Sequence, residues 1–276
     1  MGDATKYYPG KLLLFGEYTV LHGGQALAIP FNKYSGHWRF LVKTEQCKYP
    51  LKPFFKYLQA NSFLQSKMDL DAFANEIDNG IIFDSAIPIG YGAGSSGSLC
   101  AAIWDRYGCK ISNIAQLRTI FIRMESFFHG KSSGIDPLVS YLNRPILQSG
   151  EGLLILEPIT LPKEIQVYDS GISRSTAPLV EWYQDELAQN PNFKHQVIDL
   201  LLPQNEKAIK AVIEGDALAL KKAFIEISRW QREYFEPLIL NSVMSDWEKV
   251  REKRAFFKIC GAGAGGFYLV YDEKED

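Results

Sequence analysis

The stretch that decides the fold is Pro88-Ile-Gly-Tyr-Gly-Ala-Gly-Ser-Ser-Gly97. A predicted strand at 81–83 leads into it, and a predicted helix at 98–107 follows it. Its glycines let the backbone approach a ligand closely and adopt positive φ. The free N–H groups and positive dipole end of the following helix favour an anion. With the hydroxyls of Ser95 and Ser96, which can bond phosphate or ligate Mg²⁺, the stretch predicts a phosphate-binding loop; the alternative is a flexible loop with Ser96 as a helix cap.

Two other glycine-bearing segments resemble phosphate loops only in part. Gly130-Lys-Ser132 supplies the end of the P-loop pattern GxxxxGK[ST], but Glu125 stands in place of its first glycine and the preceding segment is predicted to be helical. Gly261-Ala-Gly-Ala-Gly-Gly266 matches GxGxxG, yet the chain after it is predicted to be a strand rather than a helix. The sequence therefore favours neither a P-loop fold nor a Rossmann fold.

The composition is that of a globular protein large enough to bury a substantial core: 276 residues, 46% hydrophobic and 22% charged. The net charge of −2 offers no global basic field for a nucleic acid or an anionic membrane. No apolar run approaches the roughly 20 residues of a membrane helix, and residues 1–9 do not form a secretory signal. We expect a soluble, cytoplasmic protein without nucleic-acid or membrane partners. Its four scattered cysteines, Cys47, Cys100, Cys109 and Cys260, predict neither a disulfide framework nor a zinc site.

Both halves of the chain predict a mixture of helices and strands. Strands are expected at 11–15, 25–30, 81–83, 153–156, 165–168, 256–260 and 267–271, and helices at 98–107, 114–128, 242–253 and after Asp216, an expected N-cap. The prolines at 158 and 162 suggest a boundary. The sequence thus predicts an α+β fold with two domains, residues 1–160 and 161–276.

Two charged residues have a structural and a functional interpretation. Asp136 precedes Pro137, so it could cap a helix over 137–142 or act as a general base, and the residues alone favour the cap. Lys11 lies in an apolar strand, either as an end residue reaching solvent or as a charge placed for chemistry. In the functional interpretation Glu125 is a metal ligand.

Three segments together resemble the motifs of the GHMP kinases, and they occur in the family's order. They are Pro9–Gly23, Pro88–Ser98, which is similar to the PxGxGLGSSA phosphate loop, and Cys260–Gly266. Within this superfamily, His129–Asp136 resembles the HGNPSGxD stretch of the mevalonate kinases, and Ser173–Thr176 resembles their PRxT segment. The resemblance implies a two-domain α+β fold with ATP and its acceptor in the cleft between the domains.

The resemblance also implies roles for individual residues. Asp136 would be the base and Lys11 would lie beside the acceptor hydroxyl, so we expect these side chains to meet beside the loop. Ser96 and Glu125 would bind Mg²⁺. The ATP phosphates would be held by Gly90, Gly92, Ala93, Gly94, Ser95, Ser96, Gly97 and Ser98. The acceptor side would include Glu17, Tyr18, Arg174, Thr176 and Gly263.

The implied activity is ATP- and Mg²⁺-dependent phosphorylation of a small metabolite, with mevalonate converted to phosphomevalonate in isoprenoid precursor synthesis, by a monomer or homodimer. The sequence departs from the mevalonate-kinase pattern at several places. Tyr18 replaces His and resembles the phosphomevalonate kinases, Lys131-Ser132 replaces Asn-Pro, and Ala93 and Gly97 replace Leu and Ala. The alternatives are therefore a phosphomevalonate or sugar kinase, or a nucleotide-binding sensor without catalysis.

Overall fold

The computed structural model describes residues 5–42, 48–251 and 255–272, which form two compact units interleaved along the chain. The first unit comprises the described parts of Met1–Lys11, Pro30–Ile87 and Gly94–Arg144, and the second those of Leu12–Ile29, Pro88–Ala93 and Pro145–Asp276. The chain thus passes repeatedly from one unit to the other. The division into domains at residue 160 stays a prediction. Cys47 lies outside the described residues.

Strands β1 (Tyr8–Phe15) and β2 (Ala26–Phe40) each contribute residues to both units. In the first unit, β2 pairs antiparallel with β3 (Ile81–Ser85), from Gly36 opposite Ser85 to Phe40 opposite Ile81. A Cβ at Gly36 would overlap the ring of Phe83, so the missing side chain lets that ring pack over β2. Phe83 is 1% exposed and belongs to the core of this unit.

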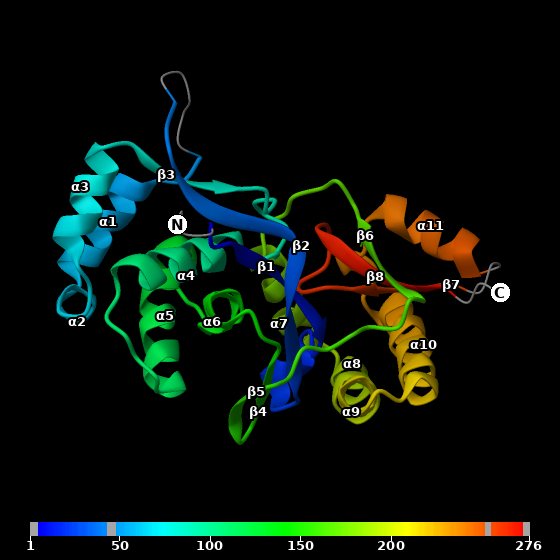
Figure 1. Ribbon diagram of the computed structural model, residues 1–276. Helices are drawn as coiled ribbons and strands as arrows, with labels where there is room; N and C mark the ends of the chain where they lie inside the picture. The colour runs from blue at the N-terminus through cyan, green and yellow to red at the C-terminus, as the bar shows by residue number, and fades with distance from the viewer. Residues whose placement is uncertain (1–4, 43–47, 252–254, 273–276) are drawn as a thin grey trace. The chain divides into compact units, whose positions relative to one another are not determined.

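The helices of the first unit surround α4, as Figure 1 shows in cyan and green. They are α1 (Leu51–Ala60), α2 (Ser62–Gln65), α3 (Leu70–Asp78), α4 (Ser95–Tyr107), α5 (Ile114–His129) and α6 (Ile135–Leu142). Helix α4 packs against both α5 and α6. Its residues Leu99, Ala102 and Ile103 are 0% exposed and belong to the core of this unit. The helix begins three residues earlier than predicted because Gly94, with φ +73°, is its N-cap.

The second unit contains two groups of antiparallel strands. Residues Ala26–Ala28 of β2 pair with β4 (Ile146–Ser149), which pairs with β5 (Gly152–Ile155). A three-stranded sheet has the order β6 (Ile165–Asp169), β8 (Phe267–Asp272) and β7 (Ala255–Ile259). Helices α10 (Ala217–Tyr234) and α11 (Asn241–Arg251) both contact β7, and Figure 1 shows the sheet between them.

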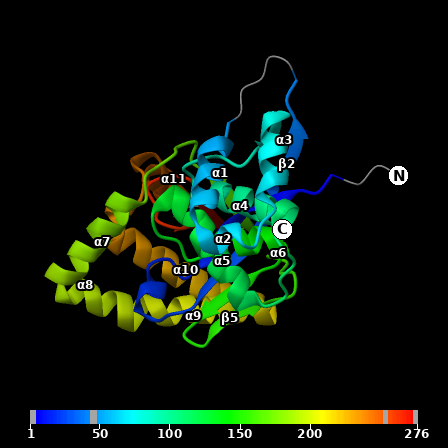
Figure 2. The same ribbon diagram turned by 90° about the vertical axis from the view of Figure 1, so that its left-hand side faces the viewer.

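In its described residues, the second unit has six further helices, of which the four between residues 177 and 214 follow one another almost without a break; Figure 2 shows α7, α8 and α9 of this run. They are the 3₁₀ helices η1 (Thr19–His22) and η3 (Glu236–Leu238), α7 (Ala177–Gln189), α8 (Pro191–His195), the π-helix η2 (Gln196–Leu201) and α9 (Leu202–Glu214). Tyr183, Phe193 and Phe235 form an aromatic core between them. The predicted cap at Asp216 is confirmed, because its Oδ1 accepts the Ala219 N–H at 2.9 Å.

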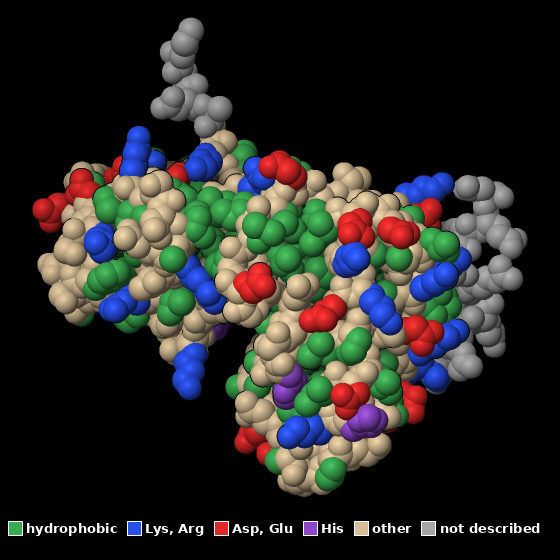
Figure 3. All heavy atoms as spheres, turned by 90° about the horizontal axis from the view of Figure 1, so that it is seen from below, with side chains coloured by type: hydrophobic (Ala, Val, Ile, Leu, Met, Phe, Trp, Pro, Cys, Tyr) green, Lys and Arg blue, Asp and Glu red, His purple; other side chains and the backbone are tan. Residues whose placement is uncertain are grey.

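The surface carries charges of both signs. On the face drawn in Figure 3, Lys and Arg side chains alternate with Asp and Glu side chains and no single sign dominates. This pattern agrees with the small net charge of −2. In the part of the chain that the structure describes, no helix has both the length and the apolar character needed to cross a membrane.

Candidate active site

The predicted phosphate loop passes into the first unit at Gly94, where α4 begins. Ser95, Ser96 and Gly97 form the first turn, so their N–H groups lie at the positive end of the helix dipole. Ser96 is 8% exposed and Ser98 is 0% exposed, and the Ser98 hydroxyl donates to the Tyr8 carbonyl at 2.9 Å. Ser98 therefore anchors α4 to β1, whereas the first turn offers backbone donors to an anion.

Lys11 and Asp136 come together at this helix start. Lys11 Nζ lies 2.9 Å from Asp136 Oδ1, with the two side chains 12% and 27% exposed. A Cβ on Gly94 would lie 3.4 Å from the Lys11 Cβ and 3.6 Å from Asp136 Oδ2. The cation and the carboxylate therefore lie against the N-cap of α4, as we expected from the sequence.

Gly97 allows α6 to approach α4 closely. A Cβ at position 97 would lie 2.8 Å from the Asp136 Cβ and 2.8 Å from the Pro137 nitrogen, which is closer than real Cβ atoms come. The alanine of the motif that the chain resembles would therefore displace Asp136 here. The position of the Asp136 carboxylate thus explains why residue 97 is a glycine.

The predicted capping role of Asp136 is wrong. Helix α6 begins at Ile135 with Gly134 as its N-cap, so Asp136 lies inside the first turn. Two serine hydroxyls fix the preceding segment instead: Ser132 Oγ accepts the Gly134 N–H at 2.9 Å, and Ser133 Oγ accepts the Ile135 N–H at 3.3 Å. Because the helix does not need its side chain as a cap, the Asp136 carboxylate is available for Lys11.

Around Ser96, four side chains form a hydrogen-bonded chain. Ser96 Oγ lies 3.4 Å from Glu125 Oε1 and 2.9 Å from His129 Nε2, and the Ser132 hydroxyl donates to Glu125 Oε2. The sequence pattern indicated Ser96 and Glu125 but not His129 and Ser132. A signal existed, because His129 lies one turn after Glu125 on α5 and Ser132 lies in the tight segment that follows.

The electrostatics of this chain suit a cation. Glu125 is 4% exposed, and burial together with the nearby Asp136 carboxylate raises its pKa to about 7, opposed by the Ser132 hydroxyl and by Lys11. A divalent cation would favour the ionised carboxylate. Mg²⁺ prefers oxygen ligands and keeps several waters, so one carboxylate and one hydroxyl at a phosphate-binding helix end fit its requirements.

The second unit holds the residues predicted for the acceptor, and two of them are engaged by other groups. Tyr18 has φ +61°, is 5% exposed, and donates from its hydroxyl to the Ala262 carbonyl at 2.8 Å. Glu17 is 2% exposed and its Oε1 lies 2.6 Å from Lys258 Nζ. Their roles toward an acceptor stay predictions. Sequence reasoning missed Lys258, although a lysine inside the apolar run Ala255–Cys260 is a signal for a buried charge pair.

Arg174 is half-buried and lies beside two glycine segments. Its Nη2 would lie 2.8 Å from a Cβ on Gly92 and 3.1 Å from one on Gly261. Its Nη1 donates to Thr176 Oγ1 at 2.8 Å, and its backbone N–H donates to the Gly90 carbonyl at 2.9 Å. Burial lowers the pKa of Arg174. Among the described residues no carboxylate pairs with this guanidinium, so it remains a donor for an anion.

The loop of the third motif is shaped by contacts within the second unit. The Ala264 N–H donates to the Leu238 carbonyl at 2.5 Å, and a Cβ on Gly263, with φ +80°, would run into the same carbonyl. In the predicted phosphate loop, by comparison, Ala93 is 2% exposed. Glycine at 263 is therefore required by the turn itself, and its part in acceptor binding stays a prediction.

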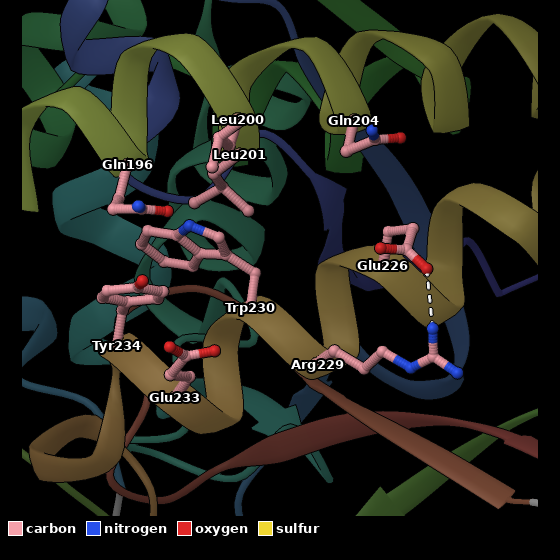
Figure 4. Close-up of a pocket in the computed structure, with 9 residues that line it drawn as sticks. All are labelled: Gln196, Leu200, Leu201, Gln204, Glu226, Arg229, Trp230, Glu233 and Tyr234. Atoms are coloured by element: carbon pink, nitrogen blue, oxygen red, sulfur yellow. Dashed lines mark hydrogen bonds and ion pairs between the residues drawn. The ribbon is translucent and has the colours of Figure 1, made fainter.

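A separate pocket of about 350 Å³ in the second unit contains none of the predicted site residues. Figure 4 shows its walls: Trp230 and Tyr234 of α10 stack at 4.9 Å between ring centroids, and Glu226 pairs with Arg229 at 2.9 Å. Facing them are residues of η2 and α9, Gln196, Leu200, Leu201 and Gln204. Two of the charged side chains that line this pocket, Glu226 and Arg229, therefore pair with each other.

Part of the sequence matches a known protein family, and known proteins are similar to nearly the whole chain. Residues 56–144 match the model of the GHMP kinases N terminal domain. A mevalonate kinase of Thermococcus sibiricus is 22% identical over 306 residues, covering 97% of this chain and 89% of that protein. One of Archaeoglobus fulgidus is 25% identical over 289 residues, covering 96% and 92%.

Solved structures share the fold. The L. major mevalonate kinase in complex with R-mevalonate has a TM-score of 0.67 at 18% identity, covering 99% of this chain and 88% of that chain. The Streptococcus pneumoniae phosphomevalonate kinase in complex with phosphomevalonate and AMPPNP has a TM-score of 0.64 at 15% identity, covering 99% and 93%. The predicted α+β, GHMP-kinase-like fold is confirmed. The resemblance of this chain to the GHMP kinases, and within them to the mevalonate kinases, is therefore confirmed by the family match and by the fold.

Proposed function

We propose that this protein is an ATP- and Mg²⁺-dependent kinase that phosphorylates the primary hydroxyl of mevalonate. The observation that carries the proposal is the ion pair of Lys11 with Asp136, 2.9 Å apart, against the N-cap of α4. The mevalonate kinases of similar sequence support the same class of reaction.

The start of α4 would hold the transferred phosphoryl group. Phosphoryl transfer depends mainly on positioning and on neutralising the charge of the γ-phosphate. The N–H groups of Ser95, Ser96 and Gly97 point out of the first turn, where the helix dipole is positive. These donors are rigid because Ser98 is buried and bonded to β1.

Asp136 would accept the proton of the attacking hydroxyl as the new O–P bond forms. Lys11 would stabilise the negative charge that develops on that oxygen. The ion pair holds both groups in place before the substrate arrives, which reduces the reorganisation that the reaction requires.

Ser96 Oγ and the Glu125 carboxylate would hold Mg²⁺, which supplies further charge neutralisation on the phosphates when bound. The acceptor itself carries a carboxylate, and Arg174 is a half-buried guanidinium that no described carboxylate neutralises. Arg174 with Thr176 would therefore bind that carboxylate, since a guanidinium forms strong charge-assisted hydrogen bonds with it.

ADP release with a panel of mevalonate, phosphomevalonate, homoserine and sugars tests the proposal. We expect turnover with mevalonate, a turnover rate lower by about 100-fold or more in Asp136→Asn, and retained ATP binding in that variant. If no alcohol is turned over and Asp136→Asn behaves as wild type, the proposal is wrong and the protein is a nucleotide-binding sensor.

A phosphomevalonate kinase is the second candidate, supported by the exposed Lys131, whose positive charge could receive a phosphorylated acceptor. The phosphomevalonate kinase of Streptococcus pneumoniae has the same fold. The same panel separates the two candidates. A preference for phosphomevalonate that is lost in Lys131→Ala would favour the second, and a preference for a sugar would exclude both.

A further inference from the structure

Ser132 makes two bonds that the motif resembled by this chain lacks. Its half-buried hydroxyl donates to Glu125 Oε2 and accepts the Gly134 N–H at 2.9 Å. The mevalonate-kinase stretch has proline at this position, and a proline side chain can neither donate nor accept a hydrogen bond. That motif therefore cannot form either bond.

The Glu125 carboxylate is held through both of its oxygens. Oε1 faces the Ser96 hydroxyl at 3.4 Å, and Oε2 accepts from the Ser132 hydroxyl. A carboxylate bonded at one oxygen only could rotate about its terminal torsion, which is broad and roughly two-fold. The bond to Ser132 removes that freedom and leaves Oε1 directed at Ser96.

The environment of Glu125 makes such support necessary. The residue is 4% exposed, so its carboxylate depends on protein groups rather than on solvent for hydrogen bonds. The Ser132 hydroxyl is one of these groups, since it donates to Glu125 Oε2. Partners of this kind orient metal-binding carboxylates and typically change metal affinity about 10–100-fold.

We propose that Ser132 is a positioning residue for the Mg²⁺ site: its hydroxyl directs Glu125 Oε1 toward Ser96 and, through Gly134, ties that carboxylate to the start of the helix that carries Asp136. The inference rests on the proposed function only in taking Glu125 and Ser96 as the metal ligands. It assigns Ser132 no direct contact with substrate.

Mn²⁺ binding in the presence of a non-hydrolysable ATP analogue, followed by electron paramagnetic resonance, tests this inference without turnover. We expect Ser132→Ala to weaken Mn²⁺ binding about 10-fold or more, and Ser132→Thr, which keeps the hydroxyl, to stay within about twofold of wild type. Ser133→Ala is the matched control, because Ser133 is the next residue and its hydroxyl accepts the Ile135 N–H. Its Mn²⁺ affinity should be unchanged.

A second pair of variants decides whether Ser132 acts through Glu125. In a Glu125→Gln background, Ser132→Ala should have little further effect on Mn²⁺ affinity, since non-additivity is the mark of a shared contact. An equal loss in both backgrounds would overturn the inference. If Ser132→Ala does not fold, Ser132→Cys, a weaker donor, should give a smaller loss in the same direction; an unchanged affinity there would also overturn it.

The outcome is separable from that of the proposed function. If wild type binds Mn²⁺ with the expected dependence on Ser132 and phosphorylates no acceptor, the inference stands and the proposed function is wrong. If wild type phosphorylates mevalonate while Ser132→Ala keeps full Mn²⁺ affinity, only the inference is wrong. Absence of Mn²⁺ and nucleotide binding in wild type would overturn both.

Discussion

Replacement of Lys258 by methionine should destabilise the second unit strongly. Lys258 and Glu17 are both 0% exposed in their side chains, with 2.6 Å between Nζ and Oε1. Lys258 Nζ also donates to the Ile259 carbonyl at 2.7 Å. The variant removes the ammonium and leaves a carboxylate buried without a compensating charge. We expect the free energy of unfolding at pH 7 to fall by about 3–5 kcal/mol.

The loss should depend on pH in a defined direction. Burial raises the pKa of Glu17, and the charge of Lys258 opposes that rise. Without Lys258, the Glu17 carboxyl of the folded variant holds a proton. The unfolded chain releases that proton above the ordinary glutamate pKa of 4.5. A state that binds more protons loses stability as pH rises, so the deficit relative to wild type should be small near pH 4 and grow toward pH 7.

Urea unfolding followed by circular dichroism at several pH values measures both effects. Lys210→Met is the control, since Lys210 is 74% exposed and pairs with Glu214 at 3.9 Å, and it should change stability by less than about 0.5 kcal/mol. The double variant Glu17→Met/Lys258→Met should recover most of the loss, because replacing both partners leaves no buried charge. A deficit under about 1 kcal/mol at pH 7, or no recovery in the double variant, would refute the reasoning.

Three further predictions concern the first unit and α10. Gly97→Ala should lower kcat about 100-fold with ATP binding largely kept, because the added Cβ displaces Asp136; steady-state kinetics with mevalonate and ATP measure this. Lys11→Met should lower kcat about 100-fold or more and change the KM for ATP much less, which the same assay detects. Asp216→Ala should lower the free energy of unfolding by about 1 kcal/mol and leave kcat unchanged, since Asp216 only caps α10, and urea unfolding beside the activity assay checks both.

Local patterns in the sequence predicted most of the individual elements. The helix predicted over 114–128 is α5, and the cap at Asp216 is where it was expected, because both predictions depend on residues within one or two turns. The start of α6 was predicted wrongly, because a local pattern can also mislead. Asp136 before a proline has the pattern of a cap, but α6 begins at Ile135 with Gly134 as its N-cap, so Asp136 already lies inside the first turn.

Long-range pairs were predictable only where a family pattern named both members. Lys11 and Asp136 were expected to meet, and they do. Glu17 and Lys258 are 241 residues apart in sequence, and nothing in either local segment identifies the other as its partner. A buried lysine needs a counter-charge, so the sequence could have predicted that Lys258 has one, but not which carboxylate provides it.

The two departures from the motif around Asp136 have a common explanation. Gly97 lets the backbone at 136–137 lie against the first turn of α4, and Ser132 bonds both Glu125 and the N-cap of α6. Both changes therefore act on the supports of the carboxylates and not on the carboxylates themselves. Because a shift of about 1 Å in a reacting group costs about 100-fold in rate, a change in one support requires a compensating change in another. Under the proposed function, the departures change the packing around Asp136 and Glu125 and keep the two carboxylates themselves.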